Sequence, residues 1–202
     1  MAEPDVVLTD YALAIECAVF AWRSGCATTL ARWSSLLFLA TAVTTLAGGT
    51  AHGFRAGARI LWGVAMLGTG VIAFAAWGAG ACLVASPRAA RTIVGVAALE
   101  LAAFAAAVAG GAQTFGFAIA NYLAASVFLL AAFAVASTRS ETWAPLAGIA
   151  GIGCTLLGAR MQQGRVALPA FSLDHNALFH VVQGAALALL FFGFRRLEGR
   201  LP

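Results

Sequence analysis

Long apolar runs separated by short polar breaks dominate the pattern of this chain. Each run is close to the ~20 residues that a helix needs to cross a hydrocarbon core of about 30 Å. The breaks contain glycine, proline, arginine and glutamine, which favour turns and membrane interfaces. The pattern predicts seven transmembrane helices, over residues 7–22, 30–48, 60–84, 92–109, 115–136, 144–158 and 176–194.

The composition supports one membrane-embedded bundle. Hydrophobic residues make up 62% of the chain and charged residues 10%, with a mean hydropathy of +0.91. A soluble domain of 202 residues has too little interior to bury that much apolar surface. We therefore expect an all-α integral membrane protein, a single polytopic domain over residues 1–202, in the inner (plasma) membrane of a bacterium. Short breaks make successive helices antiparallel.

The arginines predict the orientation of the bundle. All 12 basic residues are arginine, so a retinal-type lysine Schiff base is excluded. Their scattered positions form no basic patch, and we expect no nucleic-acid partner. On the side of the carboxyl terminus lie Arg23, Arg32, Arg88, Arg91, Arg139, Arg195, Arg196 and Arg200; on the other side lie Arg55, Arg59, Arg160 and Arg165. Positive charge gathers on the cytoplasmic side, which predicts an outside amino terminus and a cytoplasmic carboxyl terminus.

The three histidines are expected to meet at the outer end of the bundle. His52 ends the second run, while His175 and His180 open the seventh. Histidine is the commonest metal ligand, and three of them with an open position form a catalytic zinc site. His175 and His180 diverge by about 140° on a helix, so both bind one ion only if His175 precedes the helix. The alternative is that each histidine is a hydrogen-bonded packing residue.

Two acidic residues are candidates for catalysis beside these histidines. Glu16 lies inside the first apolar run, where an ionised side chain costs at least ~2.5–3.5 kcal/mol at the bilayer centre. We expect it to act as a base or support a ligand, or to form a structural hydrogen bond. Asp174 precedes the last helix. It is equally well explained as a helix cap or as a catalytic or histidine-orienting carboxylate.

Two short motifs carry a family resemblance. A glycine-rich stretch ends in His52, and Asp-His-Asn-Ala-Leu-Phe-His spans residues 174–180. With seven runs and an early Glu16, they resemble the CREST superfamily, which includes alkaline ceramidases and the adiponectin and progestin receptor family. The resemblance implies a zinc ion held by one histidine of the second span and an HxxxH motif of the last. His52 and His180 match those positions, whereas Asn176 replaces the first motif histidine.

Hypotheses from different functional classes follow. The first is a membrane-embedded, zinc-dependent hydrolase of a lipid amide or ester, with His52, His175 and His180 as metal ligands and Asp174 or Glu16 as catalytic groups. The second is a non-enzymatic receptor or carrier for a small molecule or lipid, with a polar cavity lined by Glu16, His52, Glu100, Asn121 and His180. A structural subunit of a membrane complex is a third. Membrane lipids and a lipid or small apolar ligand are the expected partners.

Overall fold

Helices account for most of the described chain. The computed structural model describes residues 3–54, 57–171 and 173–198. Within these residues no β-strand forms beyond one isolated bridge between Leu168 and Leu173. The elements are α1 (Pro4–Ser24), α2 (Thr29–Gly53), α3 (Ala58–Val84), α4 (Pro87–Ala109), α5 (Phe115–Ser137), α6 (Ala144–Gln163), the short 3₁₀ turn η1 (Pro169–Phe171) and α7 (His175–Glu198). Each of the seven expected runs lies inside one α-helix, which confirms the all-α class.

Six of these helices, α2 to α7, are long and apolar enough to cross a membrane. This supports the expectation of an integral membrane protein. The remaining helix, α1, has 21 residues and is long enough by itself. It differs because Asp10 and Glu16 lie in its body. Those two carboxyl groups have to be accommodated by the rest of the bundle.

Local sequence explains where several helices begin. The hydroxyl groups of Thr28, Ser86 and Thr114 each accept a hydrogen bond from a backbone N–H three residues further on. Ser and Thr are favoured at this position because they satisfy one of the free donors of the first turn. Pro87 follows one of these caps as the first residue of α4, where its missing N–H is not needed.

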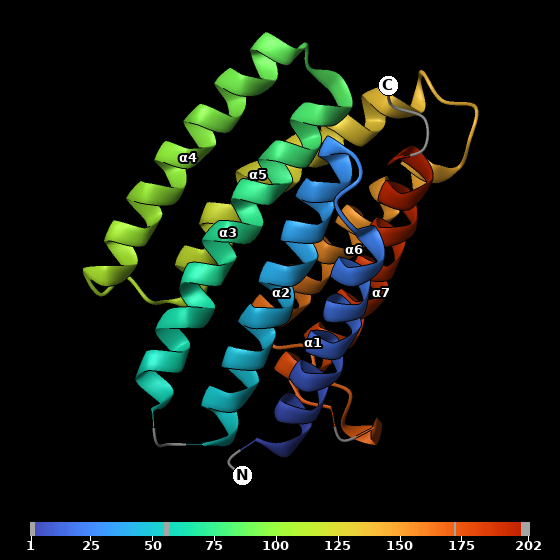
Figure 1. Ribbon diagram of the computed structural model, residues 1–202. Helices are drawn as coiled ribbons and strands as arrows, with labels where there is room; N and C mark the ends of the chain where they lie inside the picture. The colour runs from blue at the N-terminus through green and yellow to red at the C-terminus, as the bar shows by residue number, and fades with distance from the viewer. Residues whose placement is uncertain (1–2, 55–56, 172, 199–202) are drawn as a thin grey trace.

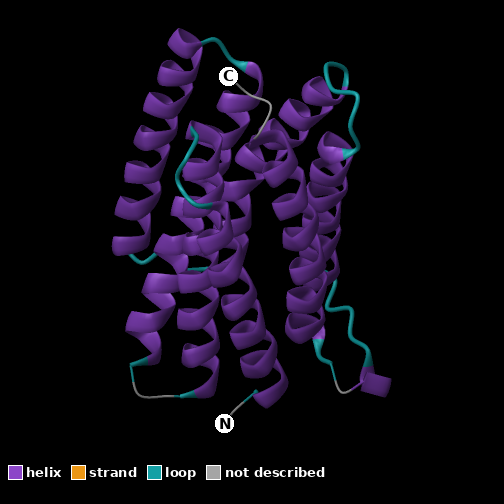
Figure 2. Ribbon diagram, turned by 45° about the vertical axis from the view of Figure 1, so that its right-hand side comes forward, coloured by secondary structure: helices purple, strands orange, loops and turns teal. Residues whose placement is uncertain are grey.

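The helices run alternately up and down, with the amino terminus at one end of the bundle and the carboxyl-terminal side at the other (Figure 1). Helix contacts follow a closed ring in the order α1, α2, α3, α5, α6, α7 and back to α1. Helix α4 packs mainly against α3, outside this ring (Figure 2). Only three residues of α4 are buried, namely Ala97, Phe104 and Val108. The ring therefore surrounds the interior without α4.

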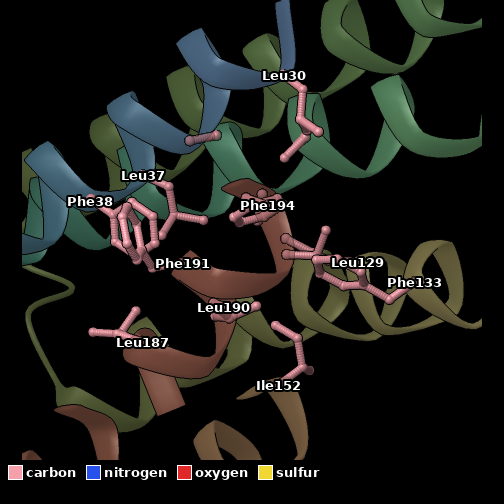
Figure 3. Packing of buried hydrophobic residues seen from close by; sticks show 14 of the residues in the cluster. Leu30, Leu37, Phe38, Leu129, Phe133, Ile152, Leu187, Leu190, Phe191 and Phe194 are labelled. Carbon is pink, nitrogen blue, oxygen red and sulfur yellow. The ribbon is translucent and has the colours of Figure 1, made fainter. Parts of the chain in front are cut away.

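The half of the ring toward the carboxyl end of α7 is densely packed. Phe191 stacks on Phe20 with a centroid separation of 4.4 Å, and Phe194 packs against Phe38 and Phe133 (Figure 3). We call this the aromatic end. The opposite end, which holds the amino terminus and all three histidines, is the histidine end.

Helices α6 and α7 approach each other closely because glycine lies at their contact. A Cβ atom on Gly151 would be 2.8 Å from the carbonyl oxygen of Ala186, and one on Gly193 would be 3.1 Å from the backbone nitrogen of Gly148. Backbone atoms cannot turn away as a flexible side chain can. Small residues are thus required at this seam, as in other membrane helix pairs. The seam holds two walls of the ring together.

Candidate functional site

A cavity of about 390 Å³ lies inside the ring. His52, His175 and His180 all line it, so the structure brings the two distant histidine motifs together. The lining residues of α2 run from Leu37 to His52, and those of α7 from His175 to Leu190. At about 1.5 Å per helical residue, the cavity is therefore about 22 Å deep, most of a ~30 Å hydrocarbon core.

The lining changes character with depth. Nearest the histidine end it carries imidazole and amide groups, from His52, Gln162, His175, Asn176 and His180. Further in, polar groups are mostly hydroxyls, from Thr41, Thr44, Thr45, Thr69, Tyr122, Ser126 and Thr155, with the amide of Gln183. The innermost wall is apolar and includes Leu37, Ala76, Leu129, Ile152 and Leu190. The cavity is therefore polar at one end and apolar at the other.

A largely buried polar contact at this site joins the first helix to the last. The Nε2 atom of His180 lies 3.3 Å from Oδ1 of Asp10, with side-chain exposures of 12% and 4%. The Nδ1 atom of His180 lies 3.2 Å from the hydroxyl oxygen of Thr9. Both imidazole nitrogens are thus engaged by α1. Together these contacts hold α7 against α1 at the wall of the cavity.

The hydrogen bonds of Thr9 indicate where the protons lie. Its hydroxyl lies 2.9 Å from the carbonyl oxygen of Asp5 and 3.0 Å from that of Val6, and it donates its single proton to them. Thr9 therefore accepts from the Nδ1–H of His180. The Nε2 atom of His180 is then the ring nitrogen that faces Asp10.

The other two histidines also face carboxylates. His52 lies in the last turn of α2, where its Nδ1 atom contacts a carboxylate oxygen of Glu3. Its ring meets that of Trp62 edge-on, with centroids 6.1 Å apart. His175 is the first residue of α7, and its Nδ1 atom is 4.0 Å from Asp174. Each histidine at this end of the cavity therefore has a different acidic neighbour.

The two acidic residues singled out from the sequence occupy different places. Asp174 caps α7, because its Oδ1 atom accepts hydrogen bonds of 2.8 Å from the N–H groups of Asn176 and Ala177. These hydrogen bonds agree with the interpretation of Asp174 as a helix cap. Glu16 does not line the cavity; it lies in a groove on the other side of His180, close to Gly184. Neither carboxylate takes the place beside His180 that Asp10 holds.

Glu100 and Asn121, proposed above as cavity liners, are also not on its wall. Glu100 belongs to α4, which lies outside the ring, so its side chain has no route to the interior. Of the five residues in that hypothesis, His52 and His180 line the cavity. Tyr122, the neighbour of Asn121, lines it from α5 instead. The polar wall thus depends more on threonine than on the mid-helix charges.

The donor set gives little support to a metal ion. Within residues 3–54, 57–171 and 173–198, no three His, Cys, Asp or Glu side chains form a group that could hold one. A zinc ion needs ligand atoms at about 2.0–2.3 Å with free lone pairs. His180 meets this only by giving up its contact with Thr9 or Asp10. The zinc ion and its ligands His52, His175 and His180 stay predictions.

Asp10 is the residue of the candidate site that the sequence interpretation missed. Its signal was present, because it is an acidic residue within the first apolar run, as Glu16 is. Gly49 in α2 is a second signal. In the structure, a Cβ on this glycine would be 2.7 Å from the Cβ of Asp10. That glycine allows α1 to approach α2 at the level of the buried carboxyl.

Replacing Asp10 and His180 by alanine, singly and together, tests their contact. Each single change should lower the free energy of unfolding by roughly 1–3 kcal/mol, because it leaves a buried polar partner unpaired. The double variant should lose less than the sum, with a coupling of roughly 0.5–3 kcal/mol. Reversible unfolding in detergent measures both quantities. The same cycle with His175→Ala in place of His180→Ala is the control and should be additive; additivity for Asp10 and His180 would contradict the contact.

Comparison with other proteins places the chain in a family. No curated protein and no solved structure matches it significantly. One family model does match, over residues 6–199. That range includes Asp10, the cavity wall and all three histidines. The chain therefore belongs to a family of unknown function, DUF6962.

Proposed function

We propose that this protein is a seven-helix membrane protein that binds an elongated amphipathic molecule, a lipid or a lipid-like compound, in its cavity. The observation that carries the proposal is the graded lining, polar at the histidine end and apolar toward the aromatic end. The volume of about 390 Å³ falls within the ~300–1,000 Å³ typical of small-molecule pockets. Of the hypotheses drawn from the sequence, this proposal is closest to the receptor or carrier.

The polar groups decide which amphiphile is bound. An acyl chain that leaves the bilayer exchanges one apolar surrounding for another, so burying it in the cavity gives little net free energy. Hydrogen bonds to the head group have no such equivalent in hydrocarbon. His52, Gln162, His175 and Asn176 supply these bonds at the histidine end. Selectivity therefore resides in this end of the cavity.

A second polar position lies deeper. The Oε1 atom of Gln183 is buried and has no hydrogen-bond partner within the described residues, although its amide nitrogen donates to Thr155. Leaving such an acceptor unpaired costs about 1–3 kcal/mol. A ligand that carries a hydroxyl or amide N–H near its head group supplies the missing donor. We therefore favour hydroxylated or amide-linked single-chain lipids.

Binding is tested with purified protein in lipid nanodiscs and a fluorescent single-chain monoacylglycerol. The wild type should bind the probe, and unlabelled oleoyl ethanolamide should displace it more strongly than oleyl acetate, which has no donor. Ala73→Phe should weaken binding at least about tenfold, because Ala73 is buried and lines the cavity. Ala102→Phe, on the exposed face of α4, is the control. A wild type that binds neither probe nor competitor would contradict the proposal.

A second candidate function, zinc-dependent hydrolysis of a lipid amide or ester, is favoured by all three histidines lining the cavity at the histidine end. Metal analysis of protein purified without chelators tests it. Hydrolysis requires about one zinc per chain, lost in His52→Ala and His180→Ala but kept in Asn176→Ala. Binding alone requires none. Metal-free protein whose melting temperature does not respond to zinc or chelator would exclude this candidate.

We also propose that the amino terminus lies outside and the carboxyl terminus in the cytoplasm of a bacterial inner membrane. At the aromatic end lie Arg23, Arg32, Arg88, Arg91, Arg139, Arg195 and Arg196; at the histidine end lie Arg59, Arg160 and Arg165. Arg55 and Arg200 lie outside the described residues. The excess supports a cytoplasmic aromatic end. The cavity then approaches the outer surface of the membrane.

The native Cys26, exposed between α1 and α2, reports the orientation. In a variant with Cys17, Cys82 and Cys154 replaced by alanine, a membrane-impermeant maleimide should label Cys26 only after the cells are permeabilised. Adding Cys26→Ala and Phe54→Cys moves the label to the exposed Phe54 position, beyond the end of α2, and should allow labelling of intact cells. The reverse pattern would show that the bundle is inverted.

A further inference from the structure

A groove of about 490 Å³ lies between α1 and α7, separate from the central cavity. Its walls are formed by Thr9, Ala12, Leu13, Glu16, His180, Val181, Gly184 and Ala185. Leu13 and His180 line both the groove and the cavity. These two side chains therefore form part of the boundary between the two spaces.

The groove opens toward the surroundings of the bundle within its apolar part. Beside it, Ile15 on α1 is 67% exposed and Val181 on α7 is 50% exposed. Exposed aliphatic side chains at this level of a membrane helix face hydrocarbon. The occupant that meets this face is thus a lipid of the surrounding bilayer. The seam is also the one place where neighbouring helices of the ring are the first and last of the chain, with no loop joining them.

The groove is shaped by small residues and carries three polar side chains. Gly184 brings the α7 backbone close to Glu16, since a Cβ there would be 2.9 Å from a carboxylate oxygen. Polar atoms along the groove come from Thr9, Glu16 and His180. Glu16 is half-buried and forms no hydrogen bond or ion pair within the described residues. Polar contacts are thus present for a head group as well as space for a chain.

We propose that this groove is a lateral portal through which a single-chain lipid passes from the bilayer into the cavity, with Leu13 and His180 as its gate. The proposal rests on the proposed function, because it gives the route to the same cavity. Opening requires His180 to leave Asp10 and Thr9. Glu16 lines the same groove and offers the displaced imidazole another acidic partner. Closure restores the contacts seen in the structure.

Measurements of binding kinetics distinguish an effect on the portal from an effect on the binding pocket. Ala185→Trp fills the exposed side of the groove without changing a residue of the cavity wall. In stopped-flow measurements with the fluorescent monoacylglycerol in nanodiscs, it should slow association and dissociation equally, each roughly tenfold, and leave the Kd unchanged. A barrier on the route affects both directions, whereas a change in the pocket alters their ratio. Ala102→Trp, exposed on α4, is the matched control and should leave both rates at the wild-type values.

A second variant, Leu13→Ala, tests the portal if Ala185→Trp does not fold. Leu13→Ala removes part of the gate and should speed association, whatever its effect on affinity. Unchanged rates in Ala185→Trp or Leu13→Ala, or slowing by Asn176→Trp at the histidine end instead, would overturn the portal while leaving binding intact. A wild type that does not bind the monoacylglycerol would overturn the proposed function and the portal together.

Discussion

The contact between Asp10 and His180 is a buried polar contact at the seam between α1 and α7, where the ring of helices closes. A carboxyl group in the body of α1 finds no hydrogen-bond partner in lipid, so its partner has to come from another helix. That partner lies on the last helix of the chain, 3.3 Å away. Without a loop between α1 and α7, side-chain contacts alone join this seam. Asp10 and His180 both line the cavity, so their contact forms part of its wall between α1 and α7.

The two halves of the ring use side chains of different size. At the aromatic end, Phe38, Phe133 and Phe194 fill the interior, and each is completely buried. At the histidine end, α2 and α3 contribute several small side chains to the cavity wall, including Thr45, Gly48, Ala65 and Thr69, beside the larger Trp62 and Met66. Dense packing at one end fixes the helices, so the other end holds an open volume without collapsing. A binding cavity and a stable bundle thus occupy separate parts of the same helices.

The helices were predictable from sequence because length and hydropathy are local properties. Each expected run lies inside an observed helix, and antiparallel order alone places the three histidines at one end. The position of α4 outside the ring was not predictable, because nothing in its apolar sequence states which helices it contacts. Asp174 stayed ambiguous for a similar reason. Its role as a cap depends on two hydrogen bonds that only the folded backbone defines.

The histidines of the candidate site were predicted from the sequence, but its carboxylate, that of Asp10, was not. Asp10 and Glu16 are six residues apart, which places them about 120° from each other around a helix. They therefore face different surroundings, and the sequence alone does not say which one meets α7 at His180. The structure places Asp10 beside the cavity and Glu16 in the outer groove. Helical periodicity separates the two, but only the packing of α1 between α2 and α7 assigns them.

A gate that has to break a buried polar contact, here that of His180 with Asp10, differs in selectivity from a gate made only of apolar side chains. Moving His180 away from Asp10 leaves two buried polar groups unpaired, which is costly in a medium of low dielectric constant. An amphiphile brings polar atoms that replace the broken contacts, whereas a plain hydrocarbon brings none. Under the proposed function, the contact that seals the cavity against bulk lipid therefore also favours entry of molecules with a head group. The same imidazole then faces the bound ligand, because His180 lines both the groove and the cavity.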